Sequence, residues 1–480
     1  MNRELAVRNP RSGKNDYTIQ PPSDADLESM AAELRGNQAA WANADIEHRC
    51  SVVTVWVEDL LDPTGGLSGE LINALATDTG RFLLAMVEAQ SIRNIAMGWA
   101  GLAPMLLSDS EERDSMTEGV GLFGQRVPYQ LAGVISPWNF PLLLSMLDAI
   151  PALVAGCAVI VKPSEVTPRF VKPLQESIAR HSELADVFRV IVGDGQTGAA
   201  LVEKVDVVAF TGSVATGRKV AEAAARNFIP ALLELGGKDP AIVLPSADLD
   251  LASKAVLRSS VQATGQACQS LERIYVHKDQ IDEFVSVLSE KAKQVELNYP
   301  DIRQGHIGPL IFARQAEIIR DHLDDAVQKG ATILCGGKVE THGGGNWILP
   351  TVMRNVDHSM KVMREETFGP LIPVMAYDTI EEAIKLANDS DYGLSAAVFG
   401  QDVEEAKAVA SKINAGAIGI NDGAVTVDVH DAGHDSFGYS GMGAARMGMS
   451  GLTRFTREKA IIVRRNEAQG IESLDERLLP

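Results

Sequence analysis

The sequence predicts an α/β protein with a doubly wound parallel sheet, followed by a second α/β domain. Several short apolar runs lack polar alternation, which is typical of strands buried on both faces of a parallel sheet. Segments with helical spacing separate these runs, as crossovers between parallel strands require. Motifs rich in Gly, Pro, Ser and Thr follow the runs, at the edge where such sheets bind ligands. The expected strands are residues 133–136, 158–161, 189–192 and 207–210.

Helical patterns lie before, between and after these strands. The segment 24–35 has apolar residues at helical spacing, with Ser23 as its cap and Asp26 in its first turn. Further helices are expected at 45–61, 70–99, 141–153, 168–181 and 198–204. The second α/β pattern has strands at 241–244 and 331–334 and helices at 279–297, 312–329, 379–388 and 402–413. No long linker separates the two domains, so we expect them to pack closely around a site.

The composition limits the possible functions. The 480 residues allow two or three domains, and the net charge of −20 argues against a nucleic-acid partner. The cysteines, at positions 50, 157, 268 and 335, are too few for a disulfide framework and lack metal-ligand spacing. They favour a reducing, cytoplasmic location. The polar N-terminus shows no signal-peptide stretch.

The segment 131–161 is apolar, with Asp148 as its only formal charge. Pro137, Pro141 and Pro151 interrupt it, and a lipid-facing helix would leave backbone groups unpaired at these breaks. We therefore expect buried strands and a helix here rather than a membrane span.

Two polar residues are candidates for covalent and acid–base chemistry. Cys268 lies in Gly-Gln-Ala-Cys-Gln, where flexible and polar neighbours suit a nucleophilic thiolate, although a buried structural thiol is the alternative. Glu234 directly precedes Leu235, Gly236 and Gly237 at an element end, where a carboxylate can act as a general base for water. A solvated glutamate at a strand end is the alternative.

Other motifs follow predicted strands. Asn139 lies in a proline-bounded turn after the first strand, where its amide could donate to an oxyanion or satisfy its own backbone. Lys162 and Glu165 follow the second strand, at the edge where doubly wound folds bind nucleotides. The segment 210–217 joins a strand to a helix whose first-turn amides can meet a pyrophosphate. Ordinary strand-to-helix loops are the alternative for both nucleotide motifs.

Two further patterns resemble functional motifs only by their letters. The GxGxxG at 119–124 follows an acidic, polar segment rather than a buried strand, so we interpret it as part of an extended arm. The segment 428–435 contains two His and three Asp, but it has the character of a loop and brings no further ligand. A solvated loop without metal is expected there.

Taken together and in this order, the motifs resemble the aldehyde dehydrogenase superfamily over nearly the whole chain. The matching segments are 137–141 (Pro-Trp-Asn-Phe-Pro), 162–165 (Lys-Pro-Ser-Glu), 210–213 (Phe-Thr-Gly-Ser), 234–238 (Glu-Leu-Gly-Gly-Lys), 265–268 (Gly-Gln-Ala-Cys), 365–370 (Glu-Glu-Thr-Phe-Gly-Pro) and 440–443 (Ser-Gly-Met-Gly). The family binds its dinucleotide differently from the ordinary Rossmann arrangement, so the resemblance does not require a GxGxxG turn.

The resemblance implies roles for individual residues. Cys268 would be the nucleophile, Glu234 the general base and Asn139 an oxyanion donor together with the Cys268 amide. Lys162 is expected among the catalytic residues and, with Glu165, at the adenosine ribose. Ser213 would touch the pyrophosphate, Glu366 the nicotinamide ribose and Phe368 the nicotinamide. The expected cofactor-binding residues are Ser136, Pro137, Trp138, Lys162, Ser164, Glu165, Gly195, Phe210, Thr211, Gly212, Ser213, Thr216, Leu235, Gly236, Glu366 and Phe368.

The family pattern also implies a domain division. Residues 1–114 and 132–234 would bind the cofactor, and 235–438 would form the catalytic domain. Residues 115–131 and 439–480 would form a small β oligomerisation arm and a C-terminal tail, so a homodimer or homotetramer is expected.

The chain departs from the family pattern near its C-terminus. Members commonly carry Pro-Phe-Gly-Gly before the Ser-Gly, whereas this chain has Asp-Ser-Phe-Gly-Tyr at 435–439, after an unusual loop at 423–434. Trp138, Phe437 and the valines of that loop indicate an apolar or aromatic aldehyde. Ala267 and Gln269, the neighbours of Cys268, provide no cation that could bind an aldehyde with a carboxylate group.

Three functions stay open at this point. The first is oxidation of an aldehyde to a carboxylate with NAD(P)⁺ through a cysteine thiohemiacetal and thioester. Acyl transfer to coenzyme A is the second, and the presence of Glu234 favours water instead. The third is a catalytically inactive nucleotide-binding member. Glu165 favours NAD over NADP, because its carboxylate would repel a 2′-phosphate, although NADP stays possible.

Overall fold

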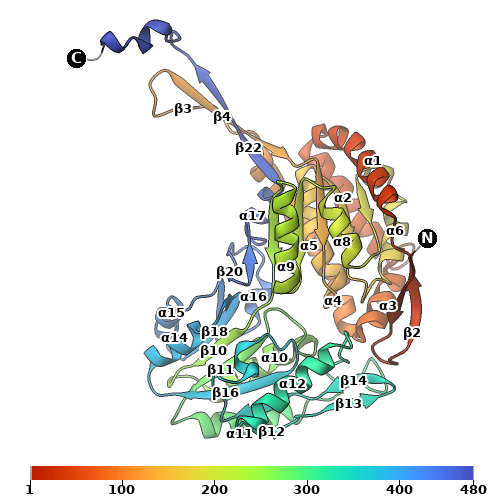
Figure 1. Cartoon of the computed structure of the whole chain (residues 1–480), viewed down its shortest axis with the longest axis vertical. Helices are drawn as coiled ribbons and strands as arrows, with labels where there is room; N and C mark the ends of the chain where they lie inside the picture. Colours follow the sequence, from red (N-terminus) through yellow and green to blue (C-terminus); the bar gives the residue numbers. More distant parts are fainter. Residues whose placement is uncertain (1–2, 479–480) are drawn as a thin grey trace.

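The computed structural model describes residues 3–478 and contains two large sheets and a projecting arm (Figure 1). A six-stranded sheet has the order β21-β9-β8-β5-β6-β7, and a seven-stranded sheet has the order β12-β15-β16-β11-β10-β18-β19. Helices cover the faces of both sheets. This architecture confirms the predicted α/β fold, because a parallel sheet must have both faces covered.

The six-stranded sheet is parallel from β9 to β7, and β21 joins its edge antiparallel to β9. Its strands are β5 (Leu131–Ile135), β6 (Ala158–Lys162), β7 (Phe188–Val190), β8 (Val207–Thr211), β9 (Ala231–Glu234) and β21 (Gly441–Met442). Every residue of β5, β6 and β8 is buried, which explains why their sequences lack polar alternation. All four predicted strands are confirmed.

Helices from the first half of the chain, and one short helix near the C-terminus, pack around this sheet. They are α1 (Asp24–Asn43), α2 (Ile46–Leu61), α3 (Ser68–Thr79), α4 (Phe82–Leu107), α5 (Pro141–Ala155), α6 (Val171–Ile178), α7 (Ser182–Ala185), α8 (Gly195–Val202), α9 (Val214–Arg226) and α17 (Ser450–Thr453). Ser23 caps α1 in a capping box with Asp26, as predicted.

Two helix predictions were wrong in extent. The helix that begins at Asp24 runs to Asn43 rather than to residue 35, because buried Gln38 and Trp41 continue its inner face. The single helix expected at 70–99 is two helices separated at Gly80, whose φ of 68° favours glycine. A side chain at Gly80 would also overlap Pro309.

The seven-stranded sheet belongs to the second half of the chain. Its strands are β10 (Asp239–Val243), β11 (Leu271–His277), β12 (Thr332–Cys335), β15 (Thr351–Arg354), β16 (Leu371–Tyr377), β18 (Ser395–Phe399) and β19 (Ala417–Ile420). β12 pairs antiparallel with β15, and the other pairs are parallel. The predicted strands at 241–244 and 331–334 correspond to β10 and β12, each displaced by one or two residues.

Helices and small hairpins complete this half. The helices are α10 (Leu249–Val261), η1 (Gln262–Gly265), α11 (Ile281–Ala292), α12 (Gln315–Gln328), α13 (Lys361–Arg364), α14 (Ile380–Asn388), α15 (Val403–Ala410) and α16 (Val425–Asp428). One hairpin is formed by β13 (Val339–His342) and β14 (Gly345–Ile348), and β17 (Tyr392–Gly393) pairs antiparallel with the distant strand β20 (Phe437–Gly438). A further hairpin, β1 (Leu5–Arg8) with β2 (Asn15–Ile19), lies near the N-terminus. One apolar core surrounds the first sheet, and a core lies on each face of the second.

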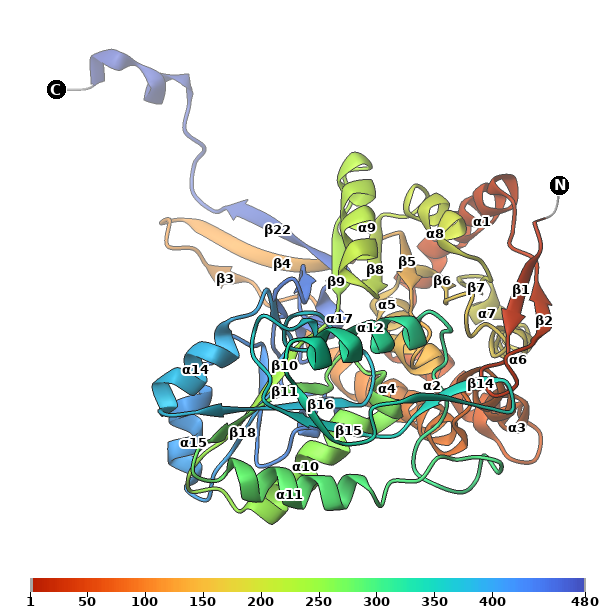
Figure 2. The same ribbon diagram turned by 60° about the horizontal axis from the view of Figure 1, so that its bottom comes forward.

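The arm extends away from both sheets (Figure 2). It consists of β3 (Arg113–Asp114), β4 (Val120–Pro128) and β22 (Thr456–Arg464), and the chain continues to η2 (Ile471–Leu474) and η3 (Glu476–Leu478). The GxGxxG at 119–124 lies at the start of β4, which confirms the interpretation as an arm. Between the second sheet and β22, the chain returns to the first sheet through β21 and through α17, which packs on α5.

Within residues 3–478, no helix is long and apolar enough to cross a membrane. Residues 141–155, in the segment that could be mistaken for a span, form the buried helix α5 between β5 and β6.

Candidate active site

The two sheets meet where the chain passes from β9 to β10. Parallel strands end at the same edge, so Ile135, Lys162, Thr211 and Glu234 all lie at the carboxyl edge of the first sheet. The loops before β10, β11 and β16 lie at the amino edge of the second sheet. Residues 235–238 join the two edges directly. The predicted site residues therefore lie along one junction.

Cys268 lies in a tightly constrained turn between η1 and β11. Ala263, Thr264 and Gly265 all have positive φ, at 55°, 63° and 69°, which two non-glycine residues adopt only when their surroundings impose it. Gln266 is fully buried and fixes the turn, because its amide donates to the carbonyls of Ala263 and Pro309 at 3.0 and 3.2 Å. The Cys268 side chain is half-buried at the end of this turn.

Asn139 is attached to the same turn. Its Nδ2 donates to the carbonyl oxygen of Gln266 at 3.0 Å, two residues before the cysteine. Arg81 donates to the carbonyls of both Asn139 and Ala263, so one buried guanidinium joins the asparagine turn to the cysteine turn. An amide nitrogen carries two hydrogens, and this bond uses one of them.

Carboxyl groups outnumber cations in the surroundings of the Cys268 thiol. Burial raises the pKa of Cys268 to about 12, and the carboxyl groups of Glu366, Asp239 and Glu234 act in the same direction. The Arg446 guanidinium opposes them and lowers the thiol pKa. Without a bound ligand the thiol is therefore held in its neutral form.

Glu234 ends β9 and is held from the C-terminal segment. Ser436 Oγ donates to Glu234 Oε2 at 3.0 Å, and Arg454 Nη1 lies 3.9 Å from Oε1. Its backbone pairs with Thr211 on one side and with Gly441 on the other. The side chain is 18% exposed, so it remains accessible to a small molecule.

A buried ion cluster beneath Glu234 was not predicted. Asp148 of α5 accepts from Arg446 Nε at 3.1 Å and from Arg446 Nη2 at 2.8 Å, and it also accepts from Arg454. All three side chains are at most 8% exposed. Asp148 was visible in the sequence as the lone charge of an apolar segment, and a buried charge needs a partner. Nothing in the sequence pattern indicates which arginines provide it.

The loop before β16 carries the residues expected at the nicotinamide. Buried Glu272 accepts the backbone N–H groups of Thr367 and Phe368, both at 2.8 Å, and pairs with Lys238 Nζ at 2.5 Å. Phe368 has a φ of 54°, and its ring packs edge-on against Trp138 at 5.3 Å between centroids. The network therefore fixes a strained backbone beside an aromatic surface.

Glu366 is turned toward the link between the two sheets. Its Oε1 accepts the N–H of Gly237 at 3.1 Å, and a side chain at Gly236 would overlap the carboxylate. Burial and the nearby charge of Glu272 raise the pKa of Glu366 to about 8. Leu235 is buried on the same link and donates its N–H to Ser440.

Lys162 belongs to the nucleotide edge. Its buried ammonium donates to the carbonyls of Pro163 and Gly193 at 3.0 and 2.9 Å, and burial lowers its pKa. Glu165 Oε2 lies 4.0 Å from Lys162 Nζ, and the Glu165 side chain is 42% exposed. No hydrogen bond joins Lys162 to Cys268, Glu234 or Asn139 among the described residues.

The other predicted cofactor residues follow the same edge. Ser213 caps α9 by accepting the N–H of Thr216 at 3.3 Å, and Gly195 begins α8, where a side chain would meet open space. A side chain at Gly212 would approach the ring of Phe210 to 2.6 Å. The two helix N-termini and the half-exposed carboxylate fit a dinucleotide with ribose and pyrophosphate groups.

Two of these residues use their hydroxyls internally. Ser136 Oγ bonds to Ser145 Oγ at 2.5 Å, and Ser164 Oγ accepts the N–H of Val166 at 3.2 Å. Pro137 is half-buried beside Ser136. If these residues contact a ligand, they do so through their backbone atoms or their apolar surface.

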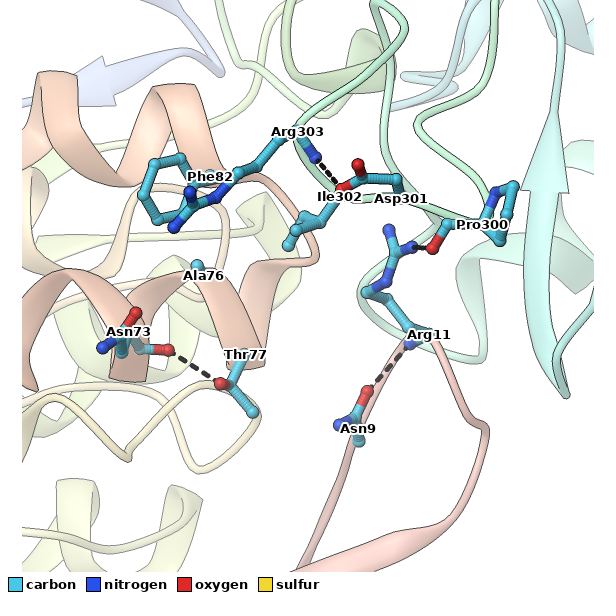
Figure 3. Close-up of a pocket in the computed structure, with 10 residues that line it drawn as sticks. All are labelled: Asn9, Arg11, Asn73, Ala76, Thr77, Phe82, Pro300, Asp301, Ile302 and Arg303. Atoms are coloured by element: carbon cyan, nitrogen blue, oxygen red, sulfur yellow. Dashed lines mark hydrogen bonds between the residues drawn. The ribbon is translucent and has the colours of Figure 1, made fainter.

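A separate cavity opens between the N-terminal hairpin and the loop near Pro300 (Figure 3). None of the predicted site residues lines it. Arg11, which extends into it, donates to Asn298 and to the Pro300 carbonyl, and the Arg303 guanidinium stacks over Phe82. Its cations therefore already have partners.

The profile of the aldehyde dehydrogenase family matches residues 1–461. A relative from Mycolicibacterium smegmatis, provisionally named succinate-semialdehyde dehydrogenase [NADP(+)], is 34% identical over 95% of this chain and 87% of its own length. The 4,4'-diapolycopene aldehyde oxidase of a Methylomonas species is 41% identical over 69% of this chain and 62% of its own length.

Solved structures agree with this match. The provisionally named aldehyde dehydrogenase PutA of Anabaena variabilis is 51% identical, with a TM-score of 0.95 over 98% of this chain and 99% of that chain. Betaine aldehyde dehydrogenase of Staphylococcus aureus, solved with NAD⁺, is 30% identical, with a TM-score of 0.89 over 98% and 96%. The fold is thus that of a two-sheet, nucleotide-dependent oxidoreductase. The chain belongs to the aldehyde dehydrogenase family, and the activity of that family is aldehyde oxidation.

Proposed function

We propose that this enzyme oxidises an apolar or aromatic aldehyde to its carboxylate, with Cys268 as the nucleophile and water as the final acyl acceptor. The observation that supports this most directly is the bond from Asn139 Nδ2 to Gln266 O, because it places an amide donor on the turn that carries the thiol. The dinucleotide is NAD or NADP, as in the relatives.

The proposed chemistry uses this chain's own groups at each step. Cys268 loses its proton to solvent, its thiolate attacks the carbonyl carbon, and the oxyanion is held by Asn139 Nδ2 and the Cys268 N–H. A nicotinamide bound in this crevice would supply the hydride acceptor for the aldehyde carbon. The resulting thioester remains on sulfur until Glu234 removes a proton from water, which attacks the acyl carbon and releases the carboxylate and the thiol.

Activation of the thiol is part of this proposal. Because the pKa of Cys268 is raised to about 12, its anion is rare at neutral pH until positive charge enters the site. An oxidised nicotinamide brings such a charge. The proposed order is therefore nucleotide first and aldehyde second, and alkylation of Cys268 should be faster with the nucleotide bound.

A cofactor preference for NAD rests on Glu165. Its half-exposed carboxylate can accept from ribose hydroxyls and would repel a 2′-phosphate, although Lys162 Nζ at 4.0 Å reduces this effect. The test is the ratio of kcat/KM for NAD⁺ and NADP⁺ in the native enzyme and in Glu165→Gln. Equal values for the native enzyme would contradict the preference.

The substrate class rests on the charge balance and on the aromatic surface. Arg446 and Arg454 are buried and already face the carboxyl groups of Asp148 and Glu234, so they offer little free charge to a carboxylated aldehyde such as succinate semialdehyde. Trp138 packs against Phe312 and Phe368, with centroid distances of 6.1 and 5.3 Å. The relative named for 4,4'-diapolycopene oxidation is consistent with an apolar substrate.

A panel of aldehydes at saturating NAD⁺ tests the substrate class, with NADH absorbance as the readout. We expect larger kcat/KM values for apolar and aromatic aldehydes than for succinate semialdehyde, and the reverse order would overturn the assignment. No signal with any aldehyde, despite nucleotide binding, would favour an inactive member. Product analysis with and without coenzyme A separates hydrolysis from acyl transfer.

We also propose a homo-oligomer in the cytoplasm. The arm strand β22 carries the exposed apolar residues Ile461, Ile462 and Val463, which a second subunit would cover. The unpaired cysteines favour a reducing compartment. Light scattering distinguishes a monomer from a dimer or tetramer.

A further inference from the structure

The segment in which this chain departs from its family's pattern is also the segment that contacts Glu234. Ser436, in the Asp-Ser-Phe-Gly-Tyr departure, donates to Glu234 Oε2 at 3.0 Å. Further along the same segment, Arg454 Nη1 lies 3.9 Å from the other carboxylate oxygen. Arg446 donates to the hydroxyl of Thr211, which pairs with Glu234 across the two strands.

We propose that Arg446 and Arg454, both held by Asp148, are positioning residues that fix the Glu234 carboxylate and supply positive charge beside the Cys268 thiol. This inference rests on the proposed roles of Cys268 and Glu234 in aldehyde oxidation. The arginines act through these groups and need no contact with the aldehyde.

The charge balance of the cluster supports the inference. Two guanidinium groups face one carboxylate of α5, so the cluster alone has one positive charge in excess. Ionised Glu234 balances that excess, and Arg454 reaches both Asp148 and Glu234. Since the guanidinium groups are buried, water screens their charge only weakly.

The hydrogen bonding of Arg454 supports the same role. Its Nε is buried and has no hydrogen-bond partner among residues 3–478. Its Nη1 donates to the Ala444 carbonyl of the C-terminal segment at 3.4 Å and also lies 3.9 Å from Glu234 Oε1. One guanidinium nitrogen thus connects the C-terminal segment to the Glu234 carboxylate.

The strand end that carries Glu234 leads directly to the cysteine turn, because a side chain at Gly237 would approach the Cys268 carbonyl oxygen to 2.6 Å. The charged groups around the thiol then define the direction of the effect. Glu366, Asp239 and Glu234 raise the pKa of Cys268, and Arg446 is the cation that lowers it. Loss of Arg446 therefore leaves a more anionic surrounding and less thiolate at a given pH. Loss of the Asp148 charge should instead increase the fraction of thiolate at a given pH, although both substitutions break the same ion cluster.

The test is the rate of iodoacetamide alkylation of Cys268 in the complete enzyme without nucleotide at pH 7, 8 and 9, with the modified peptide identified by mass spectrometry. We expect Arg446→Gln to slow alkylation about tenfold, which corresponds to a one-unit rise in the thiol pKa. We expect Asp148→Asn to accelerate it, and the double variant to return toward the native rate.

Two control variants accompany this test. Arg457→Gln removes an exposed arginine that stacks on Tyr129 in the arm, and it should leave the alkylation rate unchanged. Arg446→Lys keeps the charge and should restore much of the rate even if Arg446→Gln folds poorly. The proposal is overturned if all variants are alkylated at equal rates, or if Arg446→Gln and Asp148→Asn change the rate in the same direction. The ion cluster would then have only a structural role.

A second readout tests the part that concerns Glu234. Arg454→Gln should slow hydrolysis of the acyl-enzyme in single-turnover experiments about tenfold, while Arg457→Gln should have no effect. If Glu234→Gln also hydrolyses its acyl-enzyme normally, the proposed function of Glu234 has failed. If Glu234→Gln is slow and Arg454→Gln is normal, only the positioning role of Arg454 has failed.

Discussion

Two buried ion clusters lie near the junction of the two sheets, and they differ in the type of residue that is in excess: arginines in one and carboxyl groups in the other. On the first-sheet side, Asp148 pairs with two arginines. On the second-sheet side, Lys238 pairs with Glu272, and the carboxyl groups of Glu366 and Asp239 lie nearby. The cationic cluster contacts the candidate base, and the anionic cluster holds the loop expected at the nicotinamide.

The difference explains how one crevice can serve two opposite requirements. A cationic nicotinamide is favoured by surrounding carboxylates, whereas a thiolate and a carboxylate base are favoured by cations. Because each cluster is anchored on a different sheet, the two requirements are separated in space. Changing one cluster at a time should therefore affect different properties of the enzyme.

The largest effect is expected from the anionic cluster. Glu272→Gln leaves buried Lys238 without its counter-charge and weakens the acceptor for the N–H groups of Thr367 and Phe368. Removing one partner of a buried pair typically costs about 3–5 kcal/mol. We expect a clear fall in the free energy of unfolding, measured by chemical denaturation.

A matched control uses an exposed pair of the same residue types. Glu290→Gln removes the partner of Lys293, and both side chains are more than half exposed. Such pairs contribute about 0–1 kcal/mol, so this variant should remain close to the native stability. If both variants lose a similar free energy of unfolding, the buried Glu272 network does not contribute more to stability than the exposed pair.

The next effect lies between the clusters, at the oxyanion donor. Asn139→Ala removes the amide that is tied to Gln266 and should slow acylation roughly a hundredfold or more, since one such donor contributes about 3–4 kcal/mol. Burst kinetics with a good aldehyde measure this step. Near-normal acylation in a folded variant would remove Asn139 from the mechanism.

The sequence predicted the strands and the chain of motifs better than it predicted the clusters. Buried parallel strands leave continuous apolar runs, and the residues that follow them meet at one edge, so the grouping of Lys162, Thr211 and Glu234 could be derived locally. The partners of Asp148 could not, because Arg446 is 298 residues away and follows no periodic pattern. The break at Gly80 was missed because an isolated glycine within a helical pattern is ambiguous.

A smaller effect is expected in the pH dependence of stability. The pKa of Glu366 is raised from 4.5 to about 8, so the folded protein retains a proton that the unfolded chain loses at lower pH. This contribution to stability is complete below about pH 4.5 and is lost as the pH rises through 8, with a slope of at most about 1.4 kcal/mol per pH unit.

Glu366→Gln should reduce this decline, whereas Glu365→Gln, at a side chain that is 61% exposed, should not. Denaturation curves at pH 5, 6, 7 and 8 give the comparison. An unchanged slope in Glu366→Gln would mean that Glu366 is already ionised near neutral pH in the folded enzyme.

The smallest effect is expected from Ser436. Its hydroxyl contacts Oε2 of the candidate base Glu234, whereas Arg454 faces Oε1. Ser436→Ala removes the hydroxyl that donates to Glu234 Oε2 at 3.0 Å, and a hydrogen bond to a charged group contributes about 1.5–3 kcal/mol. Because Arg454 still faces Oε1, we expect only part of this loss, a several-fold slower acyl-enzyme hydrolysis with acylation unchanged. Ser436→Thr keeps the hydroxyl and should retain most of the rate. If Ser436→Ala instead slows acylation, Ser436 acts on the thiol rather than on Glu234. The two clusters would then not control separate steps of the reaction.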